Sequence, residues 1–221
     1  MITKTRGIYL SHIKYGETSI ICKIFTESLG LQSFIVNGIR KSKSKNIGLF
    51  QPLNIMDMVV YLNKKSELHR IKEIKPINIY STLHNDISKI SMCFFLSEFL
   101  SKICSKEENQ GDKFEFIVSS FKFLDSMEDG YSNFHIQFLL KFLKFFGFEL
   151  SSSMQISRFD SLNLETTTFI DQCIKNKYDI KIDSNNILRN KVINLLIEYY
   201  SRCLDININL KSTTVLKNIF K

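Results

Sequence analysis

Residues 5–26 read TRGIYLSHIKYGETSIICKIFT, and this stretch decides the fold of the first part of the chain. Residues 5–13 and 19–26 are two strand-like runs, the second with Ile20, Cys22 and Ile24 on one face, and residues 15–18, YGET, separate them. A period of two is typical of strands, and a short turn containing glycine between two such runs is typical of a hairpin. The stretch therefore predicts two antiparallel strands.

Three more strand-like segments follow, over residues 31–39, 53–62 and 67–74. The connections between the five segments leave no room for a crossover helix, so we expect antiparallel pairing. Five short strands in about 75 residues are typical of a small closed or partly closed barrel. The sequence predicts a five-stranded antiparallel β-barrel, with the OB-fold as the leading candidate.

The periodicity changes near Pro76, which lies in a segment that favours an extended connector. Beyond it, apolar residues recur at three- and four-residue steps, as in amphipathic helices. We expect helices over residues 82–105, 112–127, 132–146, 186–204 and 213–220, and no clear element over most of 149–184. The predicted fold is α+β and multidomain, with the barrel in residues 1–80 and an all-α helical domain in residues 81–221.

Capping residues mark where these helices should begin and end. The predicted N-caps are Ser81 or Thr82, Asp112, Ser132 or Asn133, and Ser212. Gly147 is the expected stop of the third helix, because glycine tolerates the left-handed backbone at a helix end.

The excess of positive charge is confined to the predicted barrel, residues 1–80. Residues 1–80 hold 13 Lys and Arg against 5 Asp and Glu, whereas the remaining residues hold 17 of each kind. An AT-rich genome would raise the lysine content of both parts alike, so the uneven distribution is the informative observation. Because the charges alternate with apolar residues, we expect them on a folded scaffold that meets a polyanion.

The densest basic segment is residues 40–45, RKSKSK, between the third and fourth predicted strands. An isolated run of this kind is usually only a solvated loop, but other basic residues on the same barrel favour a phosphate-binding surface. Phe25 could stack on an unpaired base, although a place in the core is at least as good an interpretation. The candidate nucleic-acid contacts are Arg40, Lys41, Lys43, Lys45, Lys14, Lys23, Arg6, Lys64, Lys65 and Phe25.

Motifs for catalysis, metal binding or export are missing from the sequence. The four histidines are far apart, and no P-loop, Rossmann or G-x-S-x-G glycine pattern occurs. The five cysteines are scattered and never in a CxxC spacing, which indicates reduced thiols of a cytoplasmic protein. No apolar stretch is long enough for a leader or a membrane span. We expect neither an enzyme nor a cofactor.

A series of short motifs occurs in a fixed order along nearly the whole chain. They are YGE at 15–17, FTE at 25–27 with LG at 29–30, GIRKSKS at 38–44, FQP at 50–52, FGF at 146–148, and LKS at 210–212 with VL at 215–216. In this order and spacing the chain resembles the bacterial DNA repair protein RecO family. Each motif alone is weak evidence, and their common order is what makes the resemblance specific.

The resemblance implies an OB-fold followed by a helical domain that binds single- and double-stranded DNA and anneals complementary strands without catalysis. It also implies a role in exchanging single-strand-binding protein (SSB) for RecA, with RecR, RecF and the SSB C-terminal tail as partners, in the cytoplasm at the nucleoid. Many members carry a four-cysteine zinc site after the glycine-aromatic turn. Residues 149–184 contain only Cys173, so we expect no zinc here.

Two other protein classes fit part of the pattern. An adaptor could use the basic barrel to bind acidic proteins without annealing DNA. A transcription regulator would need basic residues concentrated on one recognition helix, and no predicted helix has them. The adaptor is therefore the alternative that remains open.

Overall fold

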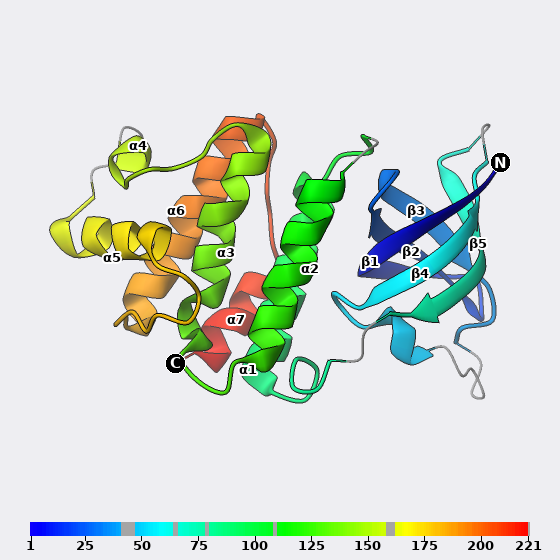
Figure 1. Ribbon diagram of the computed structural model, residues 1–221, viewed down its shortest axis with the longest axis horizontal. Coiled ribbons are helices and arrows are strands. Elements are labelled where there is room, and N and C mark those ends of the chain that lie inside the picture. The colour runs from blue at the N-terminus through cyan, green and yellow to red at the C-terminus, as the bar shows by residue number, and fades with distance from the viewer. Residues whose placement is uncertain (41–46, 64–65, 78–79, 108–109, 158–161, 221) are drawn as a thin grey trace.

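The computed structural model describes residues 1–40, 47–63, 66–77, 80–107, 110–157 and 162–220. A β-barrel forms one end of the molecule and a group of helices forms the other (Figure 1). Strands precede helices along the chain, as the change of periodicity near Pro76 predicts.

The barrel is closed and has the strand order β1-β2-β3-β5-β4. Its strands are β1 (Ile2–Tyr15), β2 (Ser19–Thr26), β3 (Gly30–Val36), β4 (Ile55–Tyr61) and β5 (Leu68–Pro76). All neighbours pair antiparallel except β3 and β5, which are parallel and close the barrel. The predicted five-stranded OB-fold is confirmed, and the expectation of antiparallel pairing fails only at this closing pair.

Alternation along β2 separates the inside of the barrel from the outside. Ile20, Cys22 and Ile24 point inward, where Cys22 lies opposite Phe34 of β3. A short 3-10 helix, η1 (Ile47–Phe50), brings Phe50 into this inner core before β4 begins. The inner core is small, so the barrel depends on further packing outside it.

The turn between β2 and β3 is shaped by the helical part of the molecule. Gly30 has a φ of +66°, a conformation that L side chains rarely adopt. A Cβ at this position would lie 2.3 Å from the carbonyl oxygen of Glu107 and 2.7 Å from that of Ser105. The loop after the first helix therefore lies directly against the barrel, and only glycine fits between them.

Six helices of eight or more residues make up most of the second part. They are α1 (Ile87–Ile103), α2 (Gly111–Ser126), α3 (Phe134–Phe142), α5 (Leu164–Lys175), α6 (Asn186–Leu204) and α7 (Ser212–Ile219). Shorter helical segments are η2 (Tyr131–Asn133), η3 (Leu143–Phe146) and α4 (Met154–Ser157). The predicted helical region is confirmed.

The first helix begins later than predicted. Backbone N–H groups of residues 81–83 donate to the carboxylate of Asp125 at distances of 2.8–3.0 Å. Ser81 and Thr82 are thus held by the end of α2 and do not cap α1. The cap is Asp86, whose carboxylate accepts two N–H groups of the first turn.

The other predicted helix ends had mixed outcomes. Gly147 follows η3 with a left-handed φ of +80°, as predicted. Asp112 lies inside α2, which begins at Gly111. Asn133 does occupy the N-cap position of α3, but its side-chain amide donates to the carbonyl of Ile182 and makes no cap hydrogen bond. Ser212 lies within the first turn of α7, where its hydroxyl donates to the carboxylate of Glu98.

Helix α5 was not predicted from the sequence. Three consecutive threonines, residues 166–168, give its segment low intrinsic helix propensity. Asn163 caps its N-terminus by accepting the N–H of Thr166 at 3.0 Å. At the other end, Nζ of Lys141 donates to the carbonyls of Cys173, Ile174 and Asn176. The Lys141 contact comes from another helix, so local periodicity could not reveal it.

One apolar core runs through the junction between barrel and helices. It contains the barrel residues Ile8, Leu10 and Phe25 together with helical residues such as Phe95 and Phe114. Because the outer wall of the barrel and the helices share this core, the proposed division of the chain at residue 80 stays a prediction.

Candidate nucleic-acid interface

Two exposed cations and a histidine lie close together at the β1–β2 hairpin. Lys14, His12 and Arg40 are all exposed there. The N–H of Arg40 donates to the carbonyl of Thr18 at 3.0 Å, and its Nη1 donates to the carbonyl of Gly16 at 3.3 Å. These two hydrogen bonds hold the start of the basic loop against the hairpin turn.

The positive charges at the hairpin act on the imidazole of His12. Partial burial, and then the charges of Arg40 and Lys14, lower the pKa of its imidazole below the ordinary value. Both cations therefore act on one point of the surface, while the imidazole stays neutral near pH 7. We call Lys14, His12 and Arg40 the hairpin cluster. Such a cluster of exposed cations suits a phosphate group.

Lys23 lies near this cluster on a different face of the same strands. It is exposed on the outer wall of β2, opposite Ser11 of β1 and Ser33 of β3. His12 instead pairs with Cys22, which points to the inside of the barrel. Lys23 thus extends the positive surface around the outside of the barrel.

Five predicted contacts lie outside the described residues. They are Lys41, Lys43, Lys45, Lys64 and Lys65. The first three follow Arg40 directly, and the other two fall in the connection between β4 and β5. In OB-folds the face of strands 2 and 3 and the β1–β2 and β4–β5 loops commonly bind oligonucleotides. These five lysines stay predictions.

Arg6 belongs to the junction and not to the hairpin cluster. Its Nε and Nη2 donate to the carboxylate of Glu27 at 2.8 and 2.6 Å, and Nη2 also pairs with Glu115 of α2. Its guanidinium carbon lies 5.0 Å from the ring centroid of Phe114. Hydrogen bonding to Glu27 raises the pKa of Arg6 further above its ordinary value. Two carboxylates already pair with this cation, which disfavours a phosphate contact by Arg6.

The prediction that Phe25 stacks on bases is wrong. Its side chain is completely buried, and its ring stacks on that of Phe114 with 6.3 Å between centroids. The strand period correctly turns Phe25 away from the small inner core. However, α2 covers the barrel wall at this point, so a side chain that points outward here is still buried.

A groove beside the hairpin cluster was missed by the sequence analysis. It has a volume of about 580 Å³ and lies between the barrel and helices α1 and α7. Its lining comprises Tyr9, Leu10, Ser11, His12, Phe50, Gln51, Pro52, Phe94, Ser97, Glu98, Lys211, Ser212 and Val215. These residues come from four separate segments, so no local pattern could have identified the groove.

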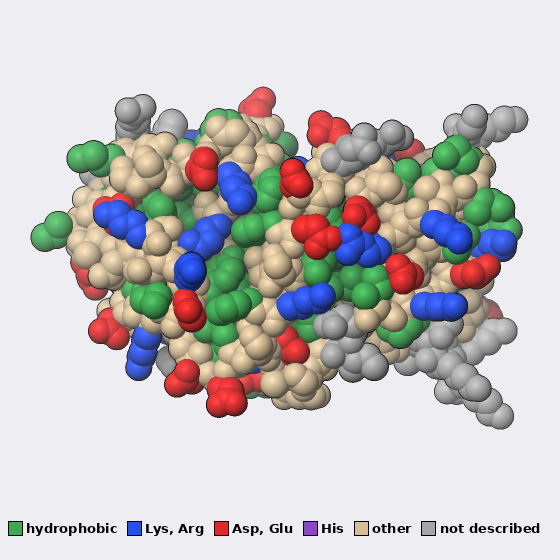
Figure 2. All heavy atoms as spheres, viewed as in Figure 1, with side chains coloured by type: hydrophobic (Ala, Val, Ile, Leu, Met, Phe, Trp, Pro, Cys, Tyr) green, Lys and Arg blue, Asp and Glu red, His purple; other side chains and the backbone are tan. Residues whose placement is uncertain are grey.

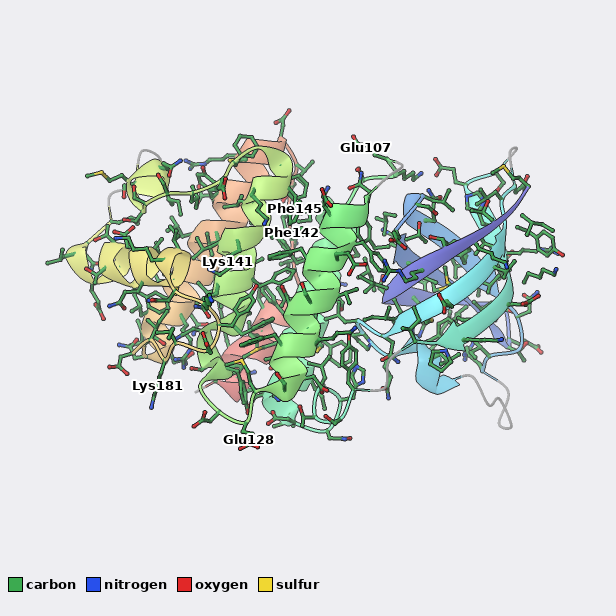
Figure 3. The ribbon with its side chains drawn as sticks, viewed as in Figure 1. Glu107, Glu128, Lys141, Phe142, Phe145 and Lys181 are labelled. Atoms are coloured by element: carbon green, nitrogen blue, oxygen red, sulfur yellow. The ribbon has the colours of Figure 1, made fainter. Side chains whose placement is uncertain are left out.

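The helical part has an aromatic face between α2 and α3. The ring of Phe116 contacts those of Phe138, Phe142 and Phe145, with centroids 5.3–5.8 Å apart. Nζ of Lys144 lies 5.3 Å from the Phe116 ring and 5.0 Å from that of Phe145. Figure 2 shows apolar side chains between these helices with basic ones beside them, and Figure 3 shows Phe142 and Phe145 between α3 and α2.

The described residues hold no group of three or more His, Cys, Asp or Glu side chains that could bind a metal ion. Cys173, the one cysteine of residues 149–184, is fully buried on α5. All five cysteines are unpaired thiols. In the part of the chain that the structure describes, no helix has the length and apolar character to cross a bilayer.

Comparison with known proteins assigns the chain to a family. The model for the recombination protein O N terminal domain matches residues 1–80, and that for the C terminal domain matches residues 84–178. "DNA repair protein RecO" of Flavobacterium johnsoniae is 33% identical, with all of both chains covered. The proteins of the same name from Phocaeicola vulgatus and Bacteroides fragilis are 32% and 29% identical, again over both full chains. The chain therefore belongs to the recombination protein O (RecO) family, and its role is in recombinational DNA repair.

Proposed function

We propose that the chain is a non-enzymatic DNA-binding protein that binds single and double strands and anneals complementary strands. The hairpin cluster is the observation that carries this proposal, because Lys14 and Arg40 are exposed and act on one point of the surface. Two DNA strands repel each other, and a cationic surface that neutralises both lowers the cost of their approach. No covalent chemistry is needed for this activity.

The proposal extends to the exchange of SSB for RecA on gapped DNA, with RecR and RecF as partners at the nucleoid. Family resemblance alone supports RecR and RecF. The acidic, Phe-ending tail of SSB has additional support in the aromatic face between α2 and α3. An apolar end group could pack among Phe116 and Phe145, and Lys144 would face the acidic residues.

Annealing of two complementary strands, each coated with SSB, is the most direct test. A RecO-type mediator should accelerate duplex formation, whereas an adaptor that binds only acidic proteins should leave the rate unchanged. An unchanged rate would therefore favour the adaptor.

A second experiment locates the DNA contacts. Replacing Arg40, Lys41, Lys43 and Lys45 with Ala should weaken binding to every sequence. The slope of log affinity against log salt should fall by roughly 0.7 for each lost single-strand phosphate contact. Unchanged affinity and slope would move the interface away from the basic loop.

The SSB tail is tested by peptide titration of the full chain. The native peptide should bind, and either Phe145→Ala or removal of the terminal Phe of the peptide should weaken it. Equal binding by both peptides would remove the aromatic face from the proposal.

A further inference from the structure

We infer that the groove between the barrel and helices α1 and α7 accepts an unpaired base of single-stranded DNA. This inference rests on the proposed function and adds a base-binding site to the phosphate-binding hairpin cluster. The walls of the groove are mainly apolar, and its volume of ≈ 580 Å³ is within the usual range for small-molecule pockets.

The position of the groove connects it with the hairpin cluster. His12 lines the groove and also feels the charges of Lys14 and Arg40. Ser11 lines it too, and the cross-strand partner of Ser11 is the exposed Lys23. A strand whose phosphates contact these cations would therefore pass the mouth of the groove.

The ring that suits stacking is Phe94 of α1. Its side chain is 51% exposed, which is unusual for so large an apolar group on a helix whose neighbouring positions are buried. The floor of the groove is already packed: the buried rings of Tyr9 and Phe50 meet edge to face with centroids 5.6 Å apart, and Tyr9 hydrogen-bonds His12. A flat base could lie against Phe94 without rearrangement of this floor.

Charge in the groove also favours DNA. Its one carboxylate, Glu98, accepts the N–H groups of Lys211 and Ser212 at 3.0 and 2.9 Å, together with the Ser212 hydroxyl. Glu98 is thus engaged at the start of α7 and its charge is partly compensated there. The exposed side chain of Lys211 adds a cation to the lining. An apolar surface bordered by cations matches a base with its phosphate better than it matches a purely apolar peptide.

The chain contains no tryptophan, so Phe94→Trp creates a unique fluorescent reporter in the groove. Titration with a labelled thymidine oligonucleotide should quench Trp emission in step with the rise in anisotropy. The matched control is Phe123→Trp, at a 37% exposed ring on α2, which should bind equally without quenching. Phe94→Ala should weaken single-strand binding by roughly 5- to 150-fold, the range typical of one stacked base. The slope of log affinity against log salt should be the same for Phe94→Ala as for the unmodified chain.

The possible results separate this inference from the proposed function. Binding without quenching, and with full affinity in Phe94→Ala, would overturn the base site and leave DNA binding intact; the groove would then be free for a protein partner. Loss of affinity that persists with an oligonucleotide of abasic sites would also overturn it, because such a strand has no base to stack. Failure of the unmodified chain to bind DNA would overturn both proposals.

Discussion

The two ends of strand β1 place similar residues in opposite surroundings. Arg6, near its start, is held by Glu27, Glu115 and the ring of Phe114, whereas Lys14, near its end, is exposed beside Arg40. The two cations are separated by eight positions on one strand. Whether helices or solvent surround this part of the strand therefore decides whether a charge stabilises the junction or is available to a ligand.

The largest effect is expected where an aromatic ring is buried at the junction. Phe25→Ala should lower the free energy of unfolding by about 3–5 kcal/mol, because it removes a fully buried ring and its stack on Phe114. Tyr15→Ala, at a 49% exposed ring of the hairpin, should change it by no more than about 0.5 kcal/mol. Urea unfolding of both variants checks this, and equal losses would contradict the contrast between the two ends.

A comparison of two turns sharpens the same contrast. Gly30→Ala should lower the free energy of unfolding by about 2–5 kcal/mol, because the strain of the left-handed backbone adds to overlap with the carbonyls of Ser105 and Glu107. Gly16→Ala has a similar φ of +56° but no atom within 4 Å, so it should cost only about 1–2 kcal/mol. Thermal unfolding measures the stability of both variants. Equal losses of stability would mean that the backbone of Ser105 and Glu107 shifts easily to make room for the added methyl group.

The two cations of β1 should separate stability from DNA binding. Arg6→Met should lower the free energy of unfolding by about 1–2 kcal/mol, a modest value because its ion pairs are partly exposed. It should leave the salt slope of DNA binding unchanged. Lys14→Met should do the reverse, with stability within about 0.5 kcal/mol and a slope lower by roughly 0.7. A lower slope in Arg6→Met would return that residue to the DNA surface.

The smallest effect concerns pH. In the free protein, burial and the charges of Arg40 and Lys14 lower the pKa of His12. Phosphates bound to those cations should raise it again, so binding takes up a proton and affinity should rise as pH falls from 8 to 6. In His12→Asn, we expect the rise in DNA affinity between pH 8 and pH 6 to be about threefold smaller, as measured by fluorescence anisotropy titration. An identical pH dependence in the variant would show that the phosphates lie elsewhere.

Local sequence was sufficient where local geometry decides the structure. The strand over residues 19–26 and the helix over residues 186–204 have the predicted bounds, because alternation and helical spacing are strong there. The stop at Gly147 follows from glycine's tolerance of the left-handed backbone.

The remaining features depend on contacts between distant segments. Helix α1 begins later than the sequence predicts because Asp125 binds the N–H groups of residues 81–83. Helix α5 is held at its C-terminal end by Lys141. In the candidate site, the period of β2 shows which way Phe25 points, but it cannot show that α2 covers that wall. The groove with Phe94 needs the barrel, α1 and α7 to be assembled first.

The shared apolar core has a consequence for synthesis of the chain. The barrel emerges from the ribosome first, and the ring that covers Phe25 belongs to Phe114, almost 90 residues later. At translation rates of roughly 5–20 residues per second, Phe114 is synthesised roughly 4 to 18 seconds after Phe25, and the barrel wall around Phe25 stays uncovered during this time. During each round of translation this wall is an uncovered apolar surface, and it is where we expect a ribosome-associated chaperone to bind the nascent chain.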